Sequence, residues 1–150
     1  MVLAIHRIAH VLCKWRVPVI PKILKIANRV LFGVVLPPSV IVGKGTLFSY
    51  QGLATVIHKS AQIGNSVIIS TGVTIGGRSG KEGAPVICDG ALIGTGAKIL
   101  GPVRVGTYAS VGANSVVIED VPDYAVAVGV PARVVRINKP EDVPRYDIFD

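Results

Sequence analysis

A branched aliphatic residue recurs at every sixth position between residues 57 and 117, with one longer interval. An α-helix has a period of 3.6 residues and a half-buried strand a period of two, so neither sustains this spacing. Short strands separated by turns at fixed intervals do sustain it, and stacked coils of such strands form a parallel β-solenoid. The repeated positions are Ile57, Ile63, Ile69, Ile75, Ile87, Ile93, Ile99, Val105, Val111 and Val117.

Two further features accompany each repeat. A small or β-branched residue stands four positions after most of the aliphatics, and glycine often follows the aliphatic directly, as in Ile93-Gly94. We expect the aliphatic to point into the shaft, the small residue to fit a crowded turn, and the glycine to adopt backbone angles closed to other residues. A valine-rich sandwich would alternate in twos and would not keep this register.

Residues 93–101, 111–117 and 129–133 resemble the hexapeptide-repeat acyltransferases, above all the serine acetyltransferases and the related O-acetyltransferases of surface polysaccharides. The resemblance spans roughly residues 36–136. It implies left-handed winding, a homotrimer, and acetyl-CoA bound in clefts between subunits. The expected fold is therefore all-β: a left-handed parallel β-helix with an N-terminal α-helical extension.

Three regions follow from this assignment. Residues 1–35 form the amphipathic helical extension, residues 36–137 the β-helix acyltransferase domain, and residues 138–150 a polar tail. Helices are expected at residues 2–15 and at about 21–31, because Pro18 and Pro21 separate them and proline suits the first turn of a helix. Leu36-Pro37-Pro38 forms the joint between the extension and the coils.

The helical extension combines apolar and basic stripes. In the first helix Ile5, Ile8, Ala9, Leu12 and Trp15 fall opposite His6, Arg7, His10 and Lys14. Such a pattern is typical of an interfacial membrane helix, so residues 1–33 are a candidate peripheral membrane contact. Alternatively, the apolar sides pack on the end of the β-helix or on neighbouring subunits. His6 and His10 are expected on an exposed polar face; no third ligand is evident and no metal is expected.

The formal net charge is +7, and no Asp or Glu precedes Glu82. The first half of the chain therefore carries only positive charges, which favours an anionic partner, either phosphate groups or acidic lipid. Nucleic acid is not expected, because the cations lie among aliphatic residues without base-stacking aromatics. Cys13 and Cys88 are too few for a disulfide framework. No uncharged run reaches the roughly 18 to 20 residues that span a bilayer. We expect a cytoplasmic protein, with residues 1–33 as its contact with the inner face of the plasma membrane.

The repeat is interrupted twice. Phe48 and Ile57 are nine residues apart rather than six, so three extra residues are accommodated around residues 49–53. Residues 76–85 are polar, glycine-rich and poor in aliphatics, which predicts a loop projecting from the shaft. Long excursions in compact domains are often functional. We therefore expect the site near these interruptions.

Acetyl transfer to a hydroxyl requires a base, and histidine is the side chain best suited to that role near neutral pH. Outside the first helix the chain has one histidine, His58, in the coil distorted by the insertion. We predict that His58 is the general base and that Tyr50 and Gln51 bind the acceptor; a solvated turn histidine is the alternative. No cysteine stands nearby, which favours direct transfer in a ternary complex over an acyl-enzyme.

The sequence also departs from the serine acetyltransferase pattern at residues that matter for catalysis. Serine acetyltransferases place an Asp-His pair in the coil that matches Ser49-Tyr50, and a second histidine where this chain has Ala84. We therefore predict an O-acetyltransferase for a sugar hydroxyl, on a lipid-linked glycan of capsule or O-antigen synthesis. The alternatives are a serine O-acetyltransferase of cysteine biosynthesis and a noncatalytic β-helix scaffold. A carbonic-anhydrase-like metal site needs three histidines, and the coils hold one.

The resemblance further implies which residues bind acetyl-CoA. Gly76, Gly77, Thr95, Gly112 and Ala113 match positions that line the pantetheine cleft, and Arg133 and Arg136 match cations near the nucleotide phosphates. Turn geometry would equally explain the small residues, and an ordinary surface charge would explain each arginine.

Overall fold

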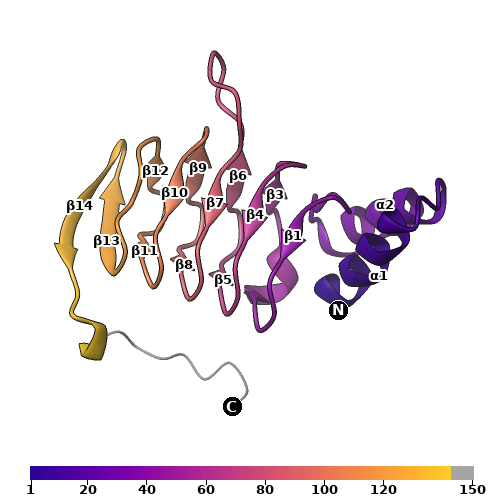
Figure 1. Ribbon diagram of the computed structural model, residues 1–150, viewed down its shortest axis with the longest axis horizontal. Helices are drawn as coiled ribbons and strands as arrows, with labels where there is room; N and C mark the ends of the chain where they lie inside the picture. The colour runs from indigo at the N-terminus through magenta and orange to yellow at the C-terminus, as the bar shows by residue number, and fades with distance from the viewer. Residues whose placement is uncertain (143–150) are drawn as a thin grey trace.

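The computed structural model describes residues 1–142 and is a three-sided parallel β-solenoid with two helices at its N-terminal end (Figure 1). It is the left-handed parallel β-helix with an N-terminal helical extension that the sequence predicts. The helices are α1 (Val2–Lys14) and α2 (Ile20–Phe32). The strands are β1 (Ile41–Val42), β2 (Leu47–Phe48), β3 (Val56–Ile57), β4 (Gln62–Ile63), β5 (Ile68–Ile69), β6 (Thr74–Gly76), β7 (Val86–Ile87), β8 (Leu92–Ile93), β9 (Lys98–Leu100), β10 (Arg104–Val105), β11 (Ser110–Val111), β12 (Val116–Val117), β13 (Ala125–Gly129) and β14 (Ala132–Ile137).

Each coil contributes one short strand to each of three faces. The first face stacks β1, β4, β7 and β10; the second stacks β2, β5, β8, β11, β13 and β14; the third stacks β3, β6, β9 and β12. We call the turn from first to second face the first corner, the turn from second to third the second corner, and the turn from third face to the next coil the third corner. All neighbours are parallel except β13 and β14, which form an antiparallel hairpin after the last coil.

The repeated aliphatics form the core of the shaft. Each of the ten is at most 2% exposed, and in-register pairing stacks Ile57, Ile75 and Ile99 directly above one another. The small residues four positions later, such as Ala91 and Ala97, are buried as well. The hexad interpretation is confirmed, since each two-residue strand turns one side chain inward and one outward. Full burial of one such aliphatic contributes about 1.5–3 kcal/mol.

The glycines that follow the aliphatics have a different cause from the one expected. They lie outside the left-handed region of backbone angles. A Cβ on Gly94 would instead lie 2.7 Å from the backbone nitrogen of Ala113, in the next coil. Because stacked strands are about 4.8 Å apart, the coils leave no room for a side chain there. The left-handed residues stand two positions later, as at Gly96 (φ +73°) and Asn114 (φ +56°).

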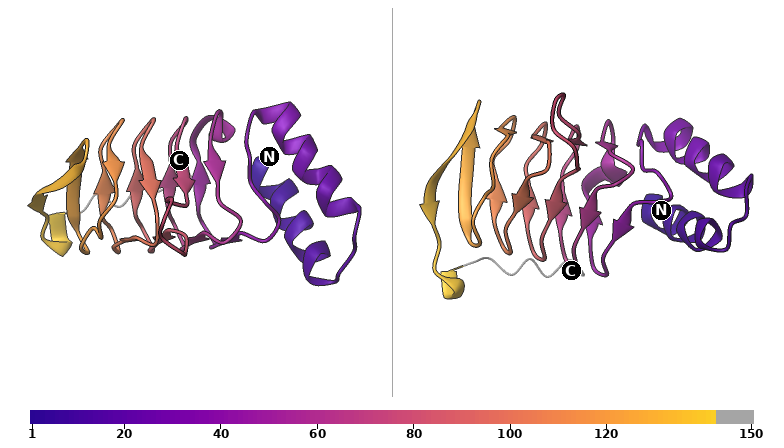
Figure 2. Two further views of the ribbon diagram at one scale, coloured as in Figure 1. Left: turned by 90° about the horizontal axis from the view of Figure 1, so that it is seen from above. Right: turned by 45° about the horizontal axis from the view of Figure 1, so that its top comes forward.

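The two helices pack against the N-terminal end of the shaft (Figure 2). The face of α1 that contacts the shaft is the histidine face, so the expectation that His6 and His10 are exposed is wrong. His6 is only 2% exposed, and its Nε2 donates to the Val40 carbonyl at 3.1 Å. His10 Nδ1 donates to the Pro38 carbonyl at 2.7 Å. The imidazoles thus satisfy two carbonyls of the proline-rich joint, and the helix is rotated to let them do so.

The expected helix boundaries agree closely with the structure. Val35 forms a parallel bridge with Val56, so the shaft begins immediately before the predicted joint. Within residues 1–142, neither helix has the length and apolar character needed to cross a bilayer. Of the predicted polar tail, residues 143–150 lie outside the described residues, and Pro140–Asp142 form a short 3-10 turn.

Both predicted interruptions of the repeat are present. The insertion is accommodated in the four-residue 3-10 turn Ser49–Gly52 at the second corner, where Tyr50 and Gln51 have left-handed φ values of 50° and 59°. Residues 77–85 leave the third corner as a projecting loop between β6 and β7 (Figure 1). An antiparallel bridge between Arg78 and Lys81 closes the tip of this loop.

Gly94→Ala should destabilise the shaft by about 3 kcal/mol, because the new methyl would meet the backbone of the next coil, which cannot move aside. Gly77→Ala is the matched control, since no atom lies within 4 Å of a Cβ there. We expect that control to change the free energy of unfolding by less than about 1 kcal/mol. Urea unfolding followed by circular dichroism measures both; equal effects would contradict the steric explanation.

The buried His6 should make folding depend on pH. Burial lowers the pKa of His6 from 6.5 to about 4, outweighing the hydrogen bond to the Val40 carbonyl. Between these values the unfolded chain binds a proton that the folded chain does not, so stability falls as the pH drops. From about pH 7 to about pH 5 the loss is about 2 kcal/mol.

His6→Gln keeps a donor for the Val40 carbonyl but does not titrate. Urea unfolding of both proteins should therefore show a weaker pH dependence for the variant between about pH 7 and about pH 5. If the two proteins lose the same stability over this range, His6 is not the titrating group.

Candidate active site

His58 lies at the third corner, directly after β3. The register that pairs Val56 with Thr74 and Ile57 with Ile75 places His58 beside Gly76, the last residue of β6. Its backbone N–H donates to the Ile75 carbonyl at 2.7 Å, which anchors the residue to the next coil. The imidazole is half-buried and therefore stands next to the base of the projecting loop while remaining accessible.

One hydrogen bond holds the His58 ring. Nδ1 accepts from the backbone N–H of Ser60 at 3.2 Å, so in the neutral ring the proton resides on Nε2. The lone pair that could accept a proton, on Nδ1, is then the one directed at Ser60. Because this contact is long and exposed, the ring can release it and turn its lone pair toward an acceptor hydroxyl.

Gly76 and Gly77 lie in the same corner as His58. Neither has a left-handed φ; a Cβ on Gly76 would make only ordinary contacts, and none at all would surround one on Gly77. Packing within the chain therefore does not explain the glycine at position 77. Open space at the base of the loop, next to a half-buried imidazole, is what an extended ligand would need.

Three other predicted cofactor residues lie elsewhere. Thr95, Gly112 and Ala113 follow β8 and β11 and line the second corner, across the third face from His58. Gly112 has a structural reason to be glycine, since a Cβ would lie 2.7 Å from the Val128 side chain. Within one chain the structure does not bring these residues to the imidazole.

Tyr50 and Gln51 also lie at the second corner, away from His58. The Gln51 Oε1 accepts hydrogen bonds from the Met1 amino group at 2.8 Å and from the Val2 N–H at 3.1 Å. This amide therefore holds the start of α1, which explains it without an acceptor. Tyr50 is 87% exposed, on the left-handed backbone of the insertion.

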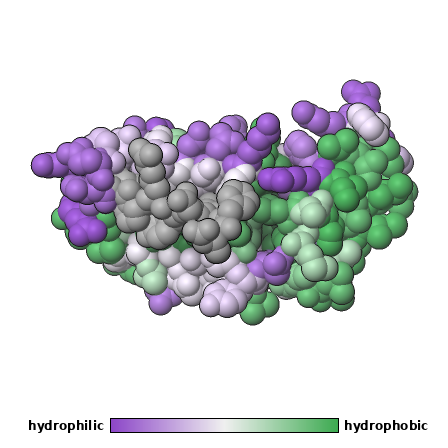
Figure 3. All heavy atoms as spheres, turned by 90° about the horizontal axis from the view of Figure 1, so that it is seen from below, coloured by the Kyte–Doolittle hydropathy of each residue, from purple (hydrophilic) through white to green (hydrophobic). Residues whose placement is uncertain are grey.

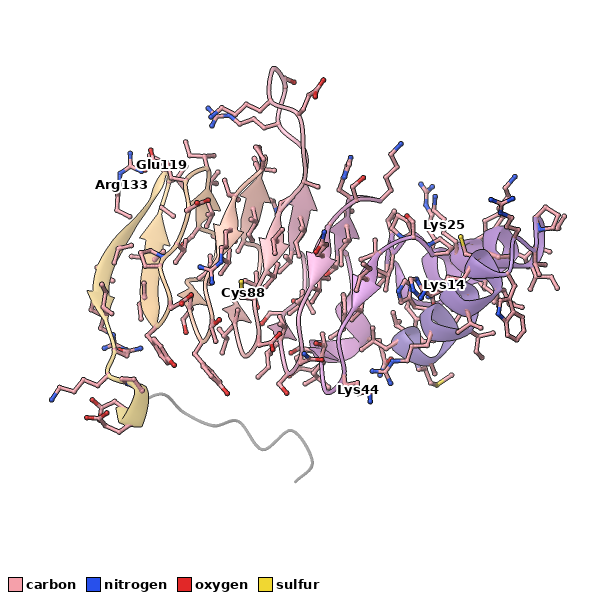
Figure 4. The ribbon with its side chains drawn as sticks, in the orientation of Figure 1. Lys14, Lys25, Lys44, Cys88, Glu119 and Arg133 are labelled. Atoms are coloured by element: carbon pink, nitrogen blue, oxygen red, sulfur yellow. The ribbon has the colours of Figure 1, made fainter. Side chains whose placement is uncertain are left out.

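The two predicted phosphate-binding arginines are separated along β14. Arg133 pairs with Glu119 at 3.2 Å (Figure 4). Arg133 is in register with Val128, beside the second corner, and its guanidinium reaches Glu119, which follows β12 at the third corner. Three coils separate it from His58, or roughly 14 Å along the shaft. Arg136 pairs in register with Val126, near the start of β13, and is exposed.

A groove of about 490 Å³ runs over the first face and the first corner, and sequence reasoning missed it. Gln62, Asn65, Val86, Cys88 and Thr107 are among its lining residues, and Cys88 is labelled in Figure 4. Asn65 Nδ2 donates to the Asp89 carboxylate at 3.2 Å. The polar groups of this corner thus mainly connect one coil to the next, and hexad spacing gave no signal of a groove.

The third corner of one chain therefore holds a usable base, open space beside it, and a cation farther along the same edge. A base and positioning are two needs of acyl transfer to a hydroxyl. The remaining predicted residues lie at the second corner.

Comparison with known proteins places the chain in context. Residues 84–119 match the family described as bacterial transferase hexapeptide (six repeats). A serine acetyltransferase of Bacillus pumilus is 42% identical over 97% of this chain and 69% of its own length. Soybean serine acetyltransferase complexed with serine superposes with a TM-score of 0.84 at 41% identity, over 89% of this chain and 56% of that one.

A serine acetyltransferase from Brucella abortus in complex with coenzyme A gives a TM-score of 0.85 at 34% identity, over 91% of this chain and 55% of that one. The chain thus spans between about half and two thirds of the length of most of these relatives. It covers 62% of the serine acetyltransferase of Bacillus subtilis, for example.

These relatives overturn one prediction. The expected acetylation of a sugar hydroxyl in surface polysaccharide synthesis is wrong, because the similar proteins are serine acetyltransferases. The glycan acceptor rests on the missing Asp-His pair and second histidine, whereas the similarity to serine acetyltransferases extends over 97% of the chain. With 42% identity to a relative of which it covers 69%, the chain belongs to the serine acetyltransferase family of hexapeptide-repeat acyltransferases.

Proposed function

We propose that this protein transfers the acetyl group of acetyl-CoA to the hydroxyl of serine, with His58 as the general base. The observation that carries the proposal is the similarity to serine acetyltransferases, which extends over both helices and the whole shaft. The accessible imidazole beside open space at the third corner supports the assignment of the base. A cytoplasmic location belongs to the proposal, supported by Cys13 and Cys88, which are both free.

In the proposed reaction the serine hydroxyl oxygen attacks the thioester carbonyl carbon while the imidazole of His58 takes the hydroxyl proton. The tetrahedral intermediate collapses with cleavage of the C–S bond. The imidazolium returns its proton to the departing thiolate, which leaves O-acetylserine and free CoA. The resting bond from Ser60 must open first, because it occupies the lone pair that accepts the proton.

His58 takes the role that the resemblance gives to histidines at other positions. Ala84 stands where the family has its second histidine, and β7 begins two residues later, so Ala84 lies at the same corner as His58, one coil farther along. The chain has two other histidines, and both His6 and His10 are engaged by carbonyls at the end of the shaft. His58 is therefore the imidazole free to act on a substrate.

A homotrimer completes the proposed site. His58, Gly76 and Gly77 lie at the third corner, and Thr95 and Ala113 at the second. If the second corner of one copy faces the third corner of another, the two sets meet across a cleft that can hold the pantetheine arm. The Arg133 guanidinium, which pairs with Glu119 of the third corner, would then be placed toward the phosphates.

His58→Ala should lower CoA release from acetyl-CoA and L-serine by about a hundredfold or more, since general-base catalysis contributes that factor. Release is followed with a thiol reagent at saturating acetyl-CoA. Lys59→Ala is the matched control, because Lys59 is an exposed neighbour of His58. The Ser39 hydroxyl donates a hydrogen bond to its backbone carbonyl, which the substitution keeps. This variant should retain near-normal activity.

Two outcomes would contradict this proposal. Activity that survives in His58→Ala would remove the base assignment. Absence of serine-dependent CoA release from the unaltered protein would remove the acceptor.

Sedimentation equilibrium should give a mass three times the 15.7 kDa of one chain. If a monomer nevertheless acetylates serine, the site does not require the second corner of a neighbouring copy, and the trimer proposal is wrong.

A further inference from the structure

Both N-terminal helices turn an apolar stripe away from the rest of the molecule. We call these the outer stripes; that of α1 consists of Ile8, Val11 and the C-cap residue Trp15, which are 57%, 44% and 73% exposed. The outer stripe of α2 consists of Ile23, Ile26 and Val30, which are 57%, 59% and 75% exposed. At 100° per residue, each stripe lies opposite the buried residues of its own helix.

The shaft is covered by the other side of each helix. Val2, His6 and Ala9 of α1 and Pro21 and Asn28 of α2 are the buried residues. Asn28 Nδ2 donates to the Val2 carbonyl at 3.3 Å and joins the two helices. Val2 lies in the core, and Leu3 and Phe32 pack against it partly buried. Docking of the helices on the shaft therefore leaves the aliphatic residues of the outer stripes exposed.

The outer stripes form a substantial apolar surface. Figure 3 shows hydrophobic side chains gathered over the helical end of the molecule. A hollow of about 390 Å³ on α1 is lined by Ile8, Val11, Leu12 and Trp15, with Arg7 at its edge. Contiguous apolar patches of this kind on a protein surface mark sites of interaction.

Cations flank both stripes. Residues 1–33 carry Arg7, Lys14, Arg16, Lys22, Lys25 and Arg29, all exposed, and contain no Asp or Glu. Within residues 1–142 the ion pairs are Arg104–Asp123 and Arg133–Glu119, so none of these six cations is paired. Figure 4 labels Lys14 and Lys25 on the helices. On α2, Lys22, Lys25 and Arg29 lie along one edge of the stripe.

This charge decides between two occupants of the surface. A second copy would bring six more cations against the first six without any carboxylate between them. An anionic lipid surface provides phosphates for the cations and a headgroup–acyl boundary for the aliphatics. Trp15 suits that boundary, where amphipathic rings concentrate.

We propose that α1 and α2 together bind the surface of an anionic bilayer, with the outer stripes in the headgroup–acyl boundary and the flanking cations at the lipid phosphates. The helices lie in the interface and do not cross it. This inference does not rest on the proposed acetyl transfer, which is measured without lipid.

Flotation with vesicles tests the proposal on the full chain. The protein should partition onto phosphatidylcholine vesicles that contain phosphatidylglycerol and much less onto phosphatidylcholine alone. Lys22→Gln/Lys25→Gln/Arg29→Gln should lower the partition coefficient about fivefold per cation, or on the order of a hundredfold in total. Ile26→Ser/Val30→Ser should lower it at least about tenfold.

Exposed residues outside the helices provide the controls. Val134→Ser/Val135→Ser removes two aliphatics of β14 that are 44% and 59% exposed, and Lys44→Gln/Lys81→Gln/Lys139→Gln removes three cations outside the helices. Both should bind vesicles like the unaltered protein. Equal loss in variants and controls, or no preference for anionic vesicles, would overturn the proposal.

A second copy on this surface would give a distinct result. The protein would then ignore vesicles, and Ile26→Ser/Val30→Ser would lower its mass in sedimentation; this outcome also overturns the proposal. The helix variants should keep their CoA release from serine, so failure of either proposal leaves the other measurable.

Discussion

The in-register stacking of coils at about 4.8 Å is the constraint on which the rest of this structure depends. It places each aliphatic of the hexad above its equivalent in the next coil, as Ile57, Ile75 and Ile99 show. It also excludes a Cβ at corner positions that lie against the backbone of the next coil, as at Gly94 and Gly106. Because the strand positions are occupied by residues that pack between coils, residues with other roles lie at the corners.

The corners are consequently where the chain departs from regularity. The 3-10 turn at Ser49–Gly52 holds the start of α1 through Gln51, while the loop at residues 77–85 opens space beside His58. An insertion on a solenoid cannot enter the packed shaft, so it either supports a neighbouring element or shapes a site. Here the first interruption does the former, and we propose that the second does the latter.

The helical extension shows how tertiary contacts override amphipathic pattern. A helix alone would turn Ile8, Val11 and Trp15 toward whatever apolar surface is near. The proline-rich joint instead presents the carbonyls of Pro38 and Val40, and a buried carbonyl without a donor is costly. His10 and His6 provide the donors, and their docking turns the aliphatic stripe outward.

The spacing of aliphatics along the sequence was sufficient to predict the solenoid, its core, both interruptions and the two helices, because each depends on local periodicity. Which residues share a corner depended on how the coils stack, so Tyr50 and Gln51 could not be separated from His58 by reading the chain. The acceptor prediction was wrong because it rested on a few missing residues, whereas the similarity to serine acetyltransferases extends over most of the chain. The orientation of α1 was decided only by tertiary structure, since it follows from two carbonyls some thirty residues away in the sequence.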